Sequence, residues 1–276
     1  MVDIWREKAD VRFGSVDRSD RLTLWSIFNY FQEAAISHAA DLGVGRDALA
    51  LTGQAWILSR LSLFIERRPA FGETVRISTW PRSWEKLFAL RDYEIRDAED
   101  IAVVRGRGGW LVLDMEKRKP LRVQPIIQSL PPNDGIDAFP AGPVALDSGE
   151  NLAKVGERTA FYSDIDYIGH VNNARYIQWI QDATDADILT KADQIRLDIN
   201  YLSEVLPGET VELLTAPLAN AGPPSGGNAA EPSAETVGRG SAPDYPRQEG
   251  AGFAYEGRRP DTGQVVFRAE LRTGTR

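Results

Sequence analysis

Two segments of the chain, Phe13-Gly-Ser-Val-Asp17 and Tyr162-Ser-Asp-Ile-Asp166, have nearly the same pattern of residue types. The similarity continues downstream, where Gly72-Glu-Thr-Val75 recurs as Gly208-Glu-Thr-Val211. A repeat of this length indicates two copies of one domain, because the units of solenoid proteins are much shorter. The chain has 276 residues, so each copy is long enough to bury its own hydrophobic core.

The composition is that of a globular protein, and it excludes several classes of site. Hydrophobic residues make up 42% of the chain, and no apolar run is long enough to cross a bilayer. The absence of cysteine excludes disulfides, thiolate metal sites and thiol nucleophiles. Only two histidines occur, His38 and His170, which argues against a histidine-rich metal centre, whereas a carboxylate site for a hard cation stays open.

Charge and the start of the sequence bear on partners and location. The formal net charge of -8 argues against a nucleic-acid partner, because such proteins usually present a basic face. Residues 1–8 are rich in charge and lack the apolar stretch of a secretory signal. We therefore expect a cytoplasmic protein without membrane insertion.

The first copy is predicted to contain a strand, a long helix and four further strands. A strand-like stretch runs from Ala9 to Val16, and apolar residues then recur at helical spacing from Leu24 to Leu42. Gly43 lies where a glycine typically ends a helix. The four β-rich runs that follow cover about residues 56–66, 74–80, 87–96 and 101–113, with a turn at 97–100.

The second copy shows the same order of elements. A strand is predicted near residues 158–163, a helix from about Asn172, and strands near 195–202, 210–215, 252–256 and 264–271. Each helix would pack against one face of a curved antiparallel sheet, and the two sheets could pair edge to edge. This α+β architecture resembles a tandem, or double, hotdog.

The pattern divides the chain into three regions. Residues 1–115 form the N-terminal hotdog, residues 116–157 a proline-rich connection, and residues 158–276 the C-terminal hotdog. The second copy carries an insertion at 217–250, which is rich in proline, glycine, alanine and serine and poor in large apolar residues. We predict that this insertion is a surface loop.

Polar chemistry is concentrated between the first strand and the helix of the second copy, at Asp166, His170, Asn172 and Asn173. A helix start offers unpaired backbone N–H groups that can stabilise an oxyanion. Histidine can transfer a proton near neutral pH, and an aspartate can orient it or position water. Alternatively, the aspartate shapes a turn, Asn172 caps the helix and His170 is a structural hydrogen-bonding group.

Comparison of the two copies favours the chemical interpretation. Asp17 of the first copy corresponds to Asp166 of the second, but Arg21 stands where the second copy has His170. Thr23 and Leu24 likewise stand in place of Asn172 and Asn173. A duplicated enzyme in which one site survives would show this difference.

The segment resembles the acyl-acyl carrier protein thioesterases, whose hallmark is Asp-x-Asp-x-Asn-x-His-Val-Asn-Asn followed by a tyrosine and a tryptophan. The resemblance covers nearly the whole chain apart from 217–250 and implies a double-hotdog hydrolase. Such an enzyme releases a free fatty acid from acyl carrier protein, which terminates chain elongation, and needs no metal or organic cofactor. Further similar motifs are Trp56-Ile-Leu-Ser-Arg60, Thr79-Trp80-Pro81, Leu87-Phe-Ala-Leu-Arg91 and Trp110-Leu-Val-Leu-Asp114.

The resemblance also implies roles for individual residues. Asp166, His170 and Glu204 match the catalytic residues of the family, and Val205 stands where a cysteine often follows the glutamate. Ile168 replaces the family asparagine two residues before the histidine, and its apolar side chain cannot hold water or a carbonyl by hydrogen bonds. Either Asn172 or Asn173 substitutes for that asparagine, or activity is weak.

Ile168 keeps other functions open. One alternative is a non-catalytic acyl-binding or regulatory protein, and a second is a thioesterase that acts on coenzyme A thioesters.

An acidic carrier would dock on a basic face, for which Arg67, Arg68 and residues 117–122 are candidates. A homodimer is a further possibility, and His38 is expected to be a packing residue. Five aromatic residues either line an acyl tunnel or pack in the core: Trp25, Phe28, Phe31, Trp56 and Trp80.

Overall fold

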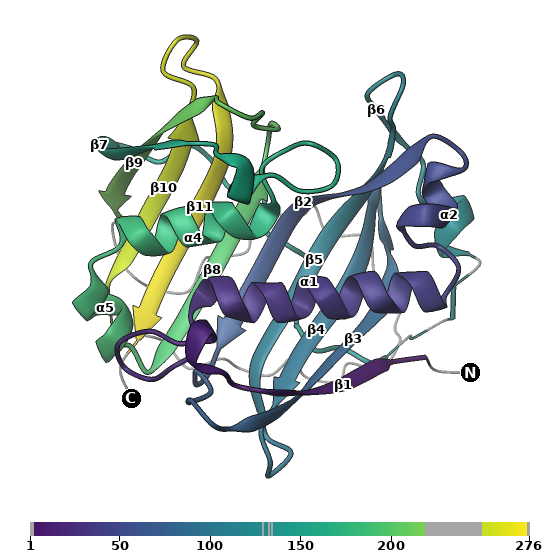
Figure 1. The fold of residues 1–276 in the computed structure, drawn as a ribbon, viewed down its shortest axis with the longest axis horizontal. Helices are drawn as coiled ribbons and strands as arrows, with labels where there is room; N and C mark the ends of the chain where they lie inside the picture. Colours follow the sequence, from purple (N-terminus) through teal and green to yellow (C-terminus); the bar gives the residue numbers. More distant parts are fainter. Residues whose placement is uncertain (1–2, 129, 132, 134, 219–249, 275–276) are drawn as a thin grey trace, which may run out of the picture.

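The computed structural model describes residues 3–128, 130–131, 133, 135–218 and 250–274. Most of the predicted insertion, residues 219–249, lies outside the described residues. The described strands form one antiparallel sheet in the order β1-β3-β4-β5-β2-β8-β11-β10-β9-β7, and β6 pairs with β5 (Figure 1). The strands are β1 (Trp5–Asp10), β2 (Gln54–Ile65), β3 (Thr74–Glu85), β4 (Phe88–Arg96), β5 (Ala102–Asp114), β6 (Lys119–Leu121), β7 (Ala153–Thr159), β8 (Gln194–Tyr201), β9 (Thr210–Pro217), β10 (Gly252–Arg258) and β11 (Val265–Gly274).

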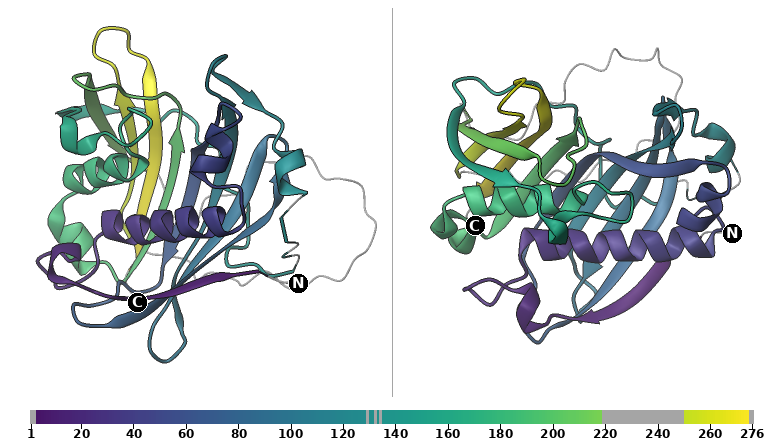
Figure 2. Two further views of the ribbon diagram at one scale, coloured as in Figure 1. Left: turned by 45° about the vertical axis from the view of Figure 1, so that its right-hand side comes forward. Right: turned by 45° about the horizontal axis from the view of Figure 1, so that its top comes forward.

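Both long helices lie on the same face of this sheet (Figure 2). They are α1 (Leu24–Asp41) and α4 (Asn173–Ala183), and three short helices accompany them: α2 (Arg46–Ala50), α3 (Gln124–Ile127) and α5 (Ala186–Lys191). The side chain of Thr23 accepts a hydrogen bond from the backbone of Ser26 at the start of α1. Gly43 follows α1 with a φ of 71°, which confirms the predicted end of that helix.

The two copies meet along their β2 and β8 strands. These strands pair antiparallel from Arg60 opposite Asn200 to Ile65 opposite Ile195, so the two half-sheets become one. Residues of both copies belong to one hydrophobic core, including Phe28 and Leu63 from the first. This arrangement confirms the predicted α+β fold and the edge-to-edge pairing of the two sheets.

The first strand of each copy lies earlier in the chain than predicted. The segments expected as strands at residues 9–16 and 158–163 contain single 3-10 turns, η1 (Phe13–Ser15) and η2 (Tyr162–Asp164), after β1 and β7. Phe13 and Tyr162, which made these segments look strand-like, are 79% and 98% exposed. Apolar residues outside the core therefore misled the prediction. Helices α2, α3 and α5 were also not predicted, because they are too short to show a clear periodicity.

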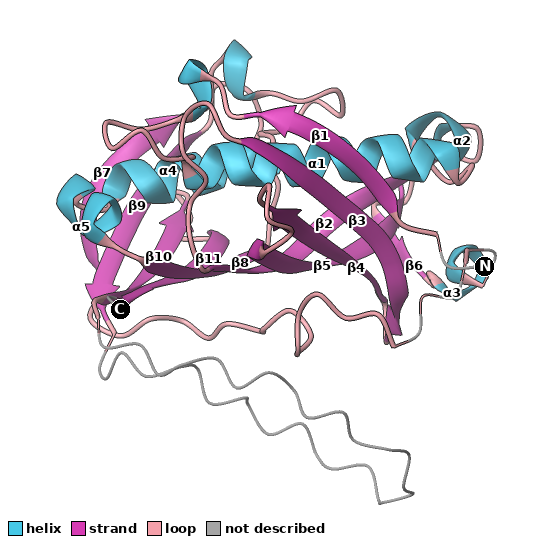
Figure 3. Cartoon of the chain, turned by 90° about the horizontal axis from the view of Figure 1, so that it is seen from below, coloured by secondary structure: helices cyan, strands magenta, loops and turns pink. Residues whose placement is uncertain are grey.

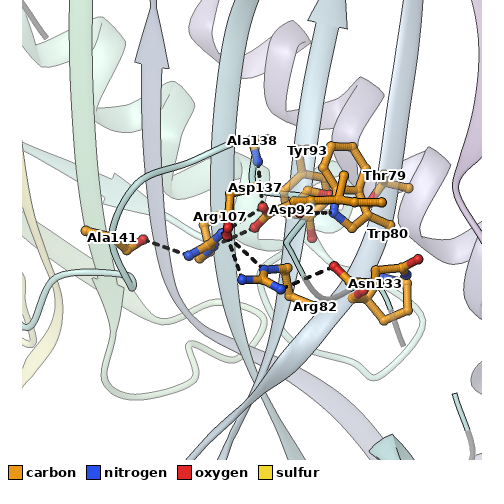
Figure 4. Close-up of polar contacts among 12 residues, drawn as sticks. Thr79, Trp80, Arg82, Asp92, Tyr93, Arg107, Asn133, Asp137, Ala138 and Ala141 are labelled. Atoms are coloured by element: carbon orange, nitrogen blue, oxygen red, sulfur yellow. Dashed lines mark hydrogen bonds and ion pairs between the residues drawn. The ribbon is translucent and has the colours of Figure 1, made fainter. Parts of the chain in front are cut away.

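The segment between the copies crosses the face of the sheet opposite the helices (Figure 3). Strand β6, helix α3 and the first residues of β7 lie within the range predicted for this connection. A buried ion cluster fixes the segment to the sheet (Figure 4). Arg107 donates to Asp92 over 2.5 and 2.7 Å and to Asp137 over 2.7 Å, and the backbone of Ala138 donates to Asp92 over 2.8 Å.

Among the described residues, no helix is long and apolar enough to cross a membrane.

Candidate active site

A cavity of about 550 Å³ lies between the two copies. One part of its wall is polar and comes from the second copy, around residues 166–173 and 201–204. The rest is mainly apolar and comes from the first copy. Residues of that apolar wall include Ala39, Val44, Trp56, Leu90, Leu111 and Leu113.

The polar wall brings His170 and Glu204 together. The His170 Nε2 atom lies 3.2 Å from a carboxylate oxygen of Glu204, and their side chains are 15% and 36% exposed. The backbone N–H of Val171 donates to the carbonyl of Val205 over 2.9 Å, which joins the two segments beside these side chains. The geometry thus places two of the predicted catalytic residues in contact at the cavity.

Asp166 also lines the cavity, but its carboxylate is engaged with the backbone. Its Oδ1 atom accepts hydrogen bonds from the backbone N–H groups of Ile168 at 2.9 Å and His170 at 3.4 Å. Gly169 completes the turn with a φ of 86°, a region that favours glycine. Asp166 therefore shapes the loop that carries His170 instead of binding the imidazole ring directly.

The two predicted asparagines hold the start of α4. The side chain of Asn172 accepts from the backbone of Ala174 over 2.8 Å and so caps the helix. The hydroxyl of Tyr201 donates to the backbone carbonyl of Asn173 over 3.1 Å. Both asparagines line the cavity, although Asn172 uses its side-chain oxygen as a cap.

Two arginines near Glu204 were not predicted as site residues. Arg118, in the β5–β6 turn at the start of the connection between the copies, forms an ion pair with the Glu204 carboxylate. Arg259 donates to the Glu204 backbone carbonyl over 2.7 Å and to the Glu209 carboxylate over 3.0 Å. Although burial acts in the opposite direction, hydrogen bonds from Leu206 and Arg259 hold the pKa of Glu209 below its usual value. Sequence gave no signal for these contacts, because both arginines lie far from Glu204 along the chain.

The predicted aromatic tunnel is only partly present. Of the five candidates, which all lie within the described part of the chain, Trp56 alone lines the cavity, together with Trp110, which was not predicted. Phe28 and Phe31 are buried in the core, and Trp80 donates to the carbonyl of Ile136 over 2.9 Å. Trp25 instead packs under the guanidinium of Arg175. The other aromatics therefore serve packing, because the inner face of α1 meets the sheet.

The predicted basic face at Arg67 and Arg68 is wrong. Arg67 pairs with Glu73 and Asp97, and Arg68 is only 6% exposed and pairs with Asp17. Both guanidinium groups are thus engaged by carboxylates of this chain.

His38 is fully buried, as predicted for a packing residue, and stacks on Trp5 with ring centroids 6.1 Å apart. Its Nδ1 atom lies 3.2 Å from Arg91, which also lines the cavity. Burial lowers the pKa of Arg91.

In the described ranges, no group of three or more His, Asp or Glu side chains is arranged to hold a metal ion.

Comparison with known proteins agrees with this architecture. Residues 3–130 match the acyl-ACP thioesterase N-terminal domain, and residues 153–250 match the acyl-ACP thioesterase C-terminal domain. The chain belongs to the acyl-ACP thioesterase family. The predicted resemblance is thereby confirmed across most of the chain.

Several curated plant thioesterases are similar in sequence. An acyl-[acyl-carrier-protein] hydrolase of Cuphea viscosissima is 24% identical over 229 residues, which cover 77% of this chain and 55% of that protein. An oleoyl-acyl carrier protein thioesterase of Coriandrum sativum is 26% identical over 235 residues, which cover 77% of this chain and 62% of that protein. The chain thus spans a little over half the length of these relatives.

Solved structures of thioesterases share the fold. An acyl-ACP thioesterase from Bacteroides thetaiotaomicron is 22% identical, with a TM-score of 0.74 and coverage of 98% of this chain and 97% of that chain. The 12:0-ACP thioesterase from Umbellularia californica is 18% identical, with a TM-score of 0.73 and coverage of 98% of this chain and 94% of that chain. These likenesses confirm the double hotdog.

Proposed function

We propose that this chain hydrolyses the thioester of fatty acyl-acyl carrier protein and so releases a free fatty acid and terminates chain elongation. The contact between His170 and Glu204 at the polar wall of a largely apolar cavity carries this proposal. The apolar wall suits an acyl chain, whereas the polar wall suits the thioester. The names of the curated relatives, which act on acyl carrier protein thioesters, support the same reaction.

The chemistry uses water as the nucleophile. Glu204 accepts a proton from water while the water oxygen bonds to the thioester carbonyl carbon. The resulting oxyanion then collapses and the carbon–sulfur bond breaks. The departing sulfur takes a proton from protonated His170, and the proton on Glu204 passes to His170 across their 3.2 Å contact. The products are a fatty acid and the carrier thiol.

The first turn of α4 supplies a candidate donor for the oxyanion. The first N–H groups of a helix have no acceptor within the helix. Asn172 accepts from two of these groups, those of Ala174 and Arg175. This leaves the backbone N–H of Asn173, next to the cavity wall, as the group that we assign to the oxyanion. Asp166 supports the site by fixing the loop between itself and His170.

The β5–β6 turn is the basic surface that we assign to the acidic carrier. Lys117 and Lys119 are exposed there, and Arg118 reaches Glu204 beside the cavity. This assignment retains the predicted cluster at residues 117–122 and leaves out Arg67 and Arg68. An acidic carrier meeting such a turn gives binding that weakens as salt rises.

A hydrolysis panel tests the function. Acyl carrier protein thioesters of several chain lengths, and the matching coenzyme A thioesters, are incubated with wild-type protein and with His170→Ala. We expect acid release from carrier thioesters that is strongly reduced in the variant, and a Michaelis constant that rises with salt. Glu33→Gln on the exposed face of α1 is the control, because Glu33 lies outside the cavity.

The panel also separates the alternatives. Equal turnover of carrier and coenzyme A thioesters would assign the site to a general acyl thioesterase. Binding of acyl chains with acid release at one background rate in wild type and His170→Ala would instead indicate an acyl-binding protein. This alternative is considered because Ile168 stands where the family has an asparagine.

A further inference from the structure

The turn between β5 and β6 presents Arg118 in a constrained conformation. The Asp114 carboxylate accepts hydrogen bonds from the backbone N–H groups of Glu116 at 3.1 Å and Lys117 at 2.9 Å. The hydrogen bond from the Lys117 backbone is the main reason why the pKa of Asp114 is lowered. Arg118 then adopts a φ of 51°, which a residue other than glycine rarely adopts. The fold therefore fixes where this arginine projects from the turn.

The guanidinium of Arg118 and the ring of His170 share one oxygen of Glu204. His170 Nε2 lies 3.2 Å from the Oε2 atom of Glu204, and an Nη2 hydrogen of Arg118 is donated to the same atom. Arg259 holds the Glu204 backbone carbonyl from the other side. Glu204 is thus held at its backbone by Arg259 of the second copy, and at one carboxylate oxygen by His170 and by Arg118 of the connection.

We propose that Arg118 is a positioning residue for Glu204, contributed to the second-copy site by the start of the connection, where β6 pairs with β5 of the first copy. This inference rests on the proposed function. By binding Oε2, Arg118 holds the carboxylate in one orientation and leaves Oε1 as the oxygen that accepts the proton of the attacking water. The site is then incomplete without the β5–β6 turn, even though His170 and Glu204 both belong to the C-terminal hotdog.

This role differs from carrier docking, which the basic cluster as a whole suggests. A docking residue acts on the carrier and affects the Michaelis constant, whereas a positioning residue acts on the chemical step and affects kcat. Lys117 and Lys119, on the same turn, suit docking: the Lys117 side chain is 71% exposed. Arg118 alone among these three binds the candidate catalytic carboxylate.

The kinetic test compares two substrates that share an acyl chain. One is the acyl carrier protein thioester, and the other is the acyl-pantetheine thioester, which lacks the carrier. We expect Arg118→Gln to lower kcat about tenfold on both substrates. Arg118→Lys keeps a positive donor and should restore part of this loss. Lys119→Gln should raise only the Michaelis constant for the carrier substrate.

A readout that does not depend on turnover accompanies the kinetics. The chain has only two histidines, so proton NMR can follow the ring of His170 with His38 as an internal reference. In Arg118→Gln, the Glu204 carboxylate contacts His170 alone, so the ring proton resonances of His170 should shift while those of His38 stay in place. Asp166 and Arg259 surround the same loop and are unchanged in this variant.

The outcomes are distinct. Loss of carrier affinity with kcat intact on both substrates would overturn the proposal and assign Arg118 to docking. Unchanged His170 ring resonances in Arg118→Gln would likewise overturn it, because Arg118 would then not share the carboxylate. If wild-type protein releases no acid while the His170 resonances shift as expected, the proposed hydrolysis fails but the contact of Arg118 with Glu204 stands.

Discussion

The loop that carries His170 and the matching loop of the first copy have the same backbone. The N–H of Val171 donates to Val205 over 2.9 Å in one copy, and the N–H of Leu22 donates to Pro69 over 2.8 Å in the other. Asp166 and Asp17 each accept from the backbone two residues on, at 2.9 and 2.8 Å. The two loops are therefore one turn design used twice.

The segments that pair with the two loops, which follow β8 in the second copy and β2 in the first, differ in charge. Where the second copy has Glu204 before Val205, the first has Arg68 before Pro69. Arg68 is buried, pairs with Asp17, and donates to the carbonyl of Leu189 over 2.9 Å. A second cavity of about 400 Å³ remains there, but its wall has an arginine instead of a glutamate. The shared turn therefore provides only the backbone conformation, and the candidate chemistry depends on a few side chains that differ between the copies.

The largest expected effect is in the second copy, where Glu204→Gln removes the proposed base. An amide cannot accept the proton of water, so kcat should fall by about 10²–10⁴-fold. Acid release under single-turnover conditions measures this loss. Turnover close to that of wild type would assign the base elsewhere in the cavity.

The matching change in the first copy should affect stability and not chemistry. Arg68→Gln leaves Asp17 without its buried partner, so the free energy of unfolding should fall by about 3 kcal/mol. Urea denaturation measures the change, with the more exposed Arg21→Gln as the control. A loss no greater than that of the control would show that the pair contributes little.

Replacing Ile168 by asparagine should sharpen the contrast between the loops. The new amide would lie at the cavity wall, where it can hold water or the thioester carbonyl, and kcat should rise about tenfold. The same hydrolysis assay measures the gain. Because Ser19 occupies the corresponding place in the first loop, Ser19→Asn is the matched control and should leave kcat unchanged. An unaltered kcat in Ile168→Asn would show that Asn172 or Asn173 already fills this role.

The smallest expected effect is a pH dependence of stability from the first loop. Burial acts against it, but hydrogen bonds from Ser19 and Arg68 lower the pKa of Asp17 below 3.8. A lowered carboxylate pKa stabilises the fold above the unfolded value, and this gain is lost as pH falls from about 3.8 through the folded pKa. Comparing the unfolding of wild type and Asp17→Asn from pH 7 to pH 2 tests this. A difference that stays constant over that range would contradict it.

Much of the fold could be predicted from the sequence, because its long elements have clear periodicity. The helix from Leu24 and the strands after it were located to within a few residues. The first strand of each copy was misplaced, since the exposed Phe13 and Tyr162 imitate buried strand residues. Local pattern cannot show whether an apolar side chain faces the core.

The candidate site was predictable only in part. The residue types beside the helix start and the comparison of the two copies predict His170, the family resemblance adds Glu204, and the structure brings the two side chains together. The contacts of Arg118 and Arg259 depend on how strands distant in sequence are placed, so no local motif reports them. Asp166 shapes the turn and Asn172 caps the helix. The residue types had suggested these structural roles as the alternative to a chemical one.

The pairing of β2 with β8 makes the chain equivalent to a dimer whose subunits are tethered. Residues 60–65 and 195–200 would each present a row of unpaired backbone groups if the halves were produced separately. The covalent connection keeps the two edges at a high effective concentration, so their association does not depend on the amount of protein in the cell. The same tether lets the two halves differ, which identical subunits cannot do, and it guarantees that every Glu204 meets one Arg118.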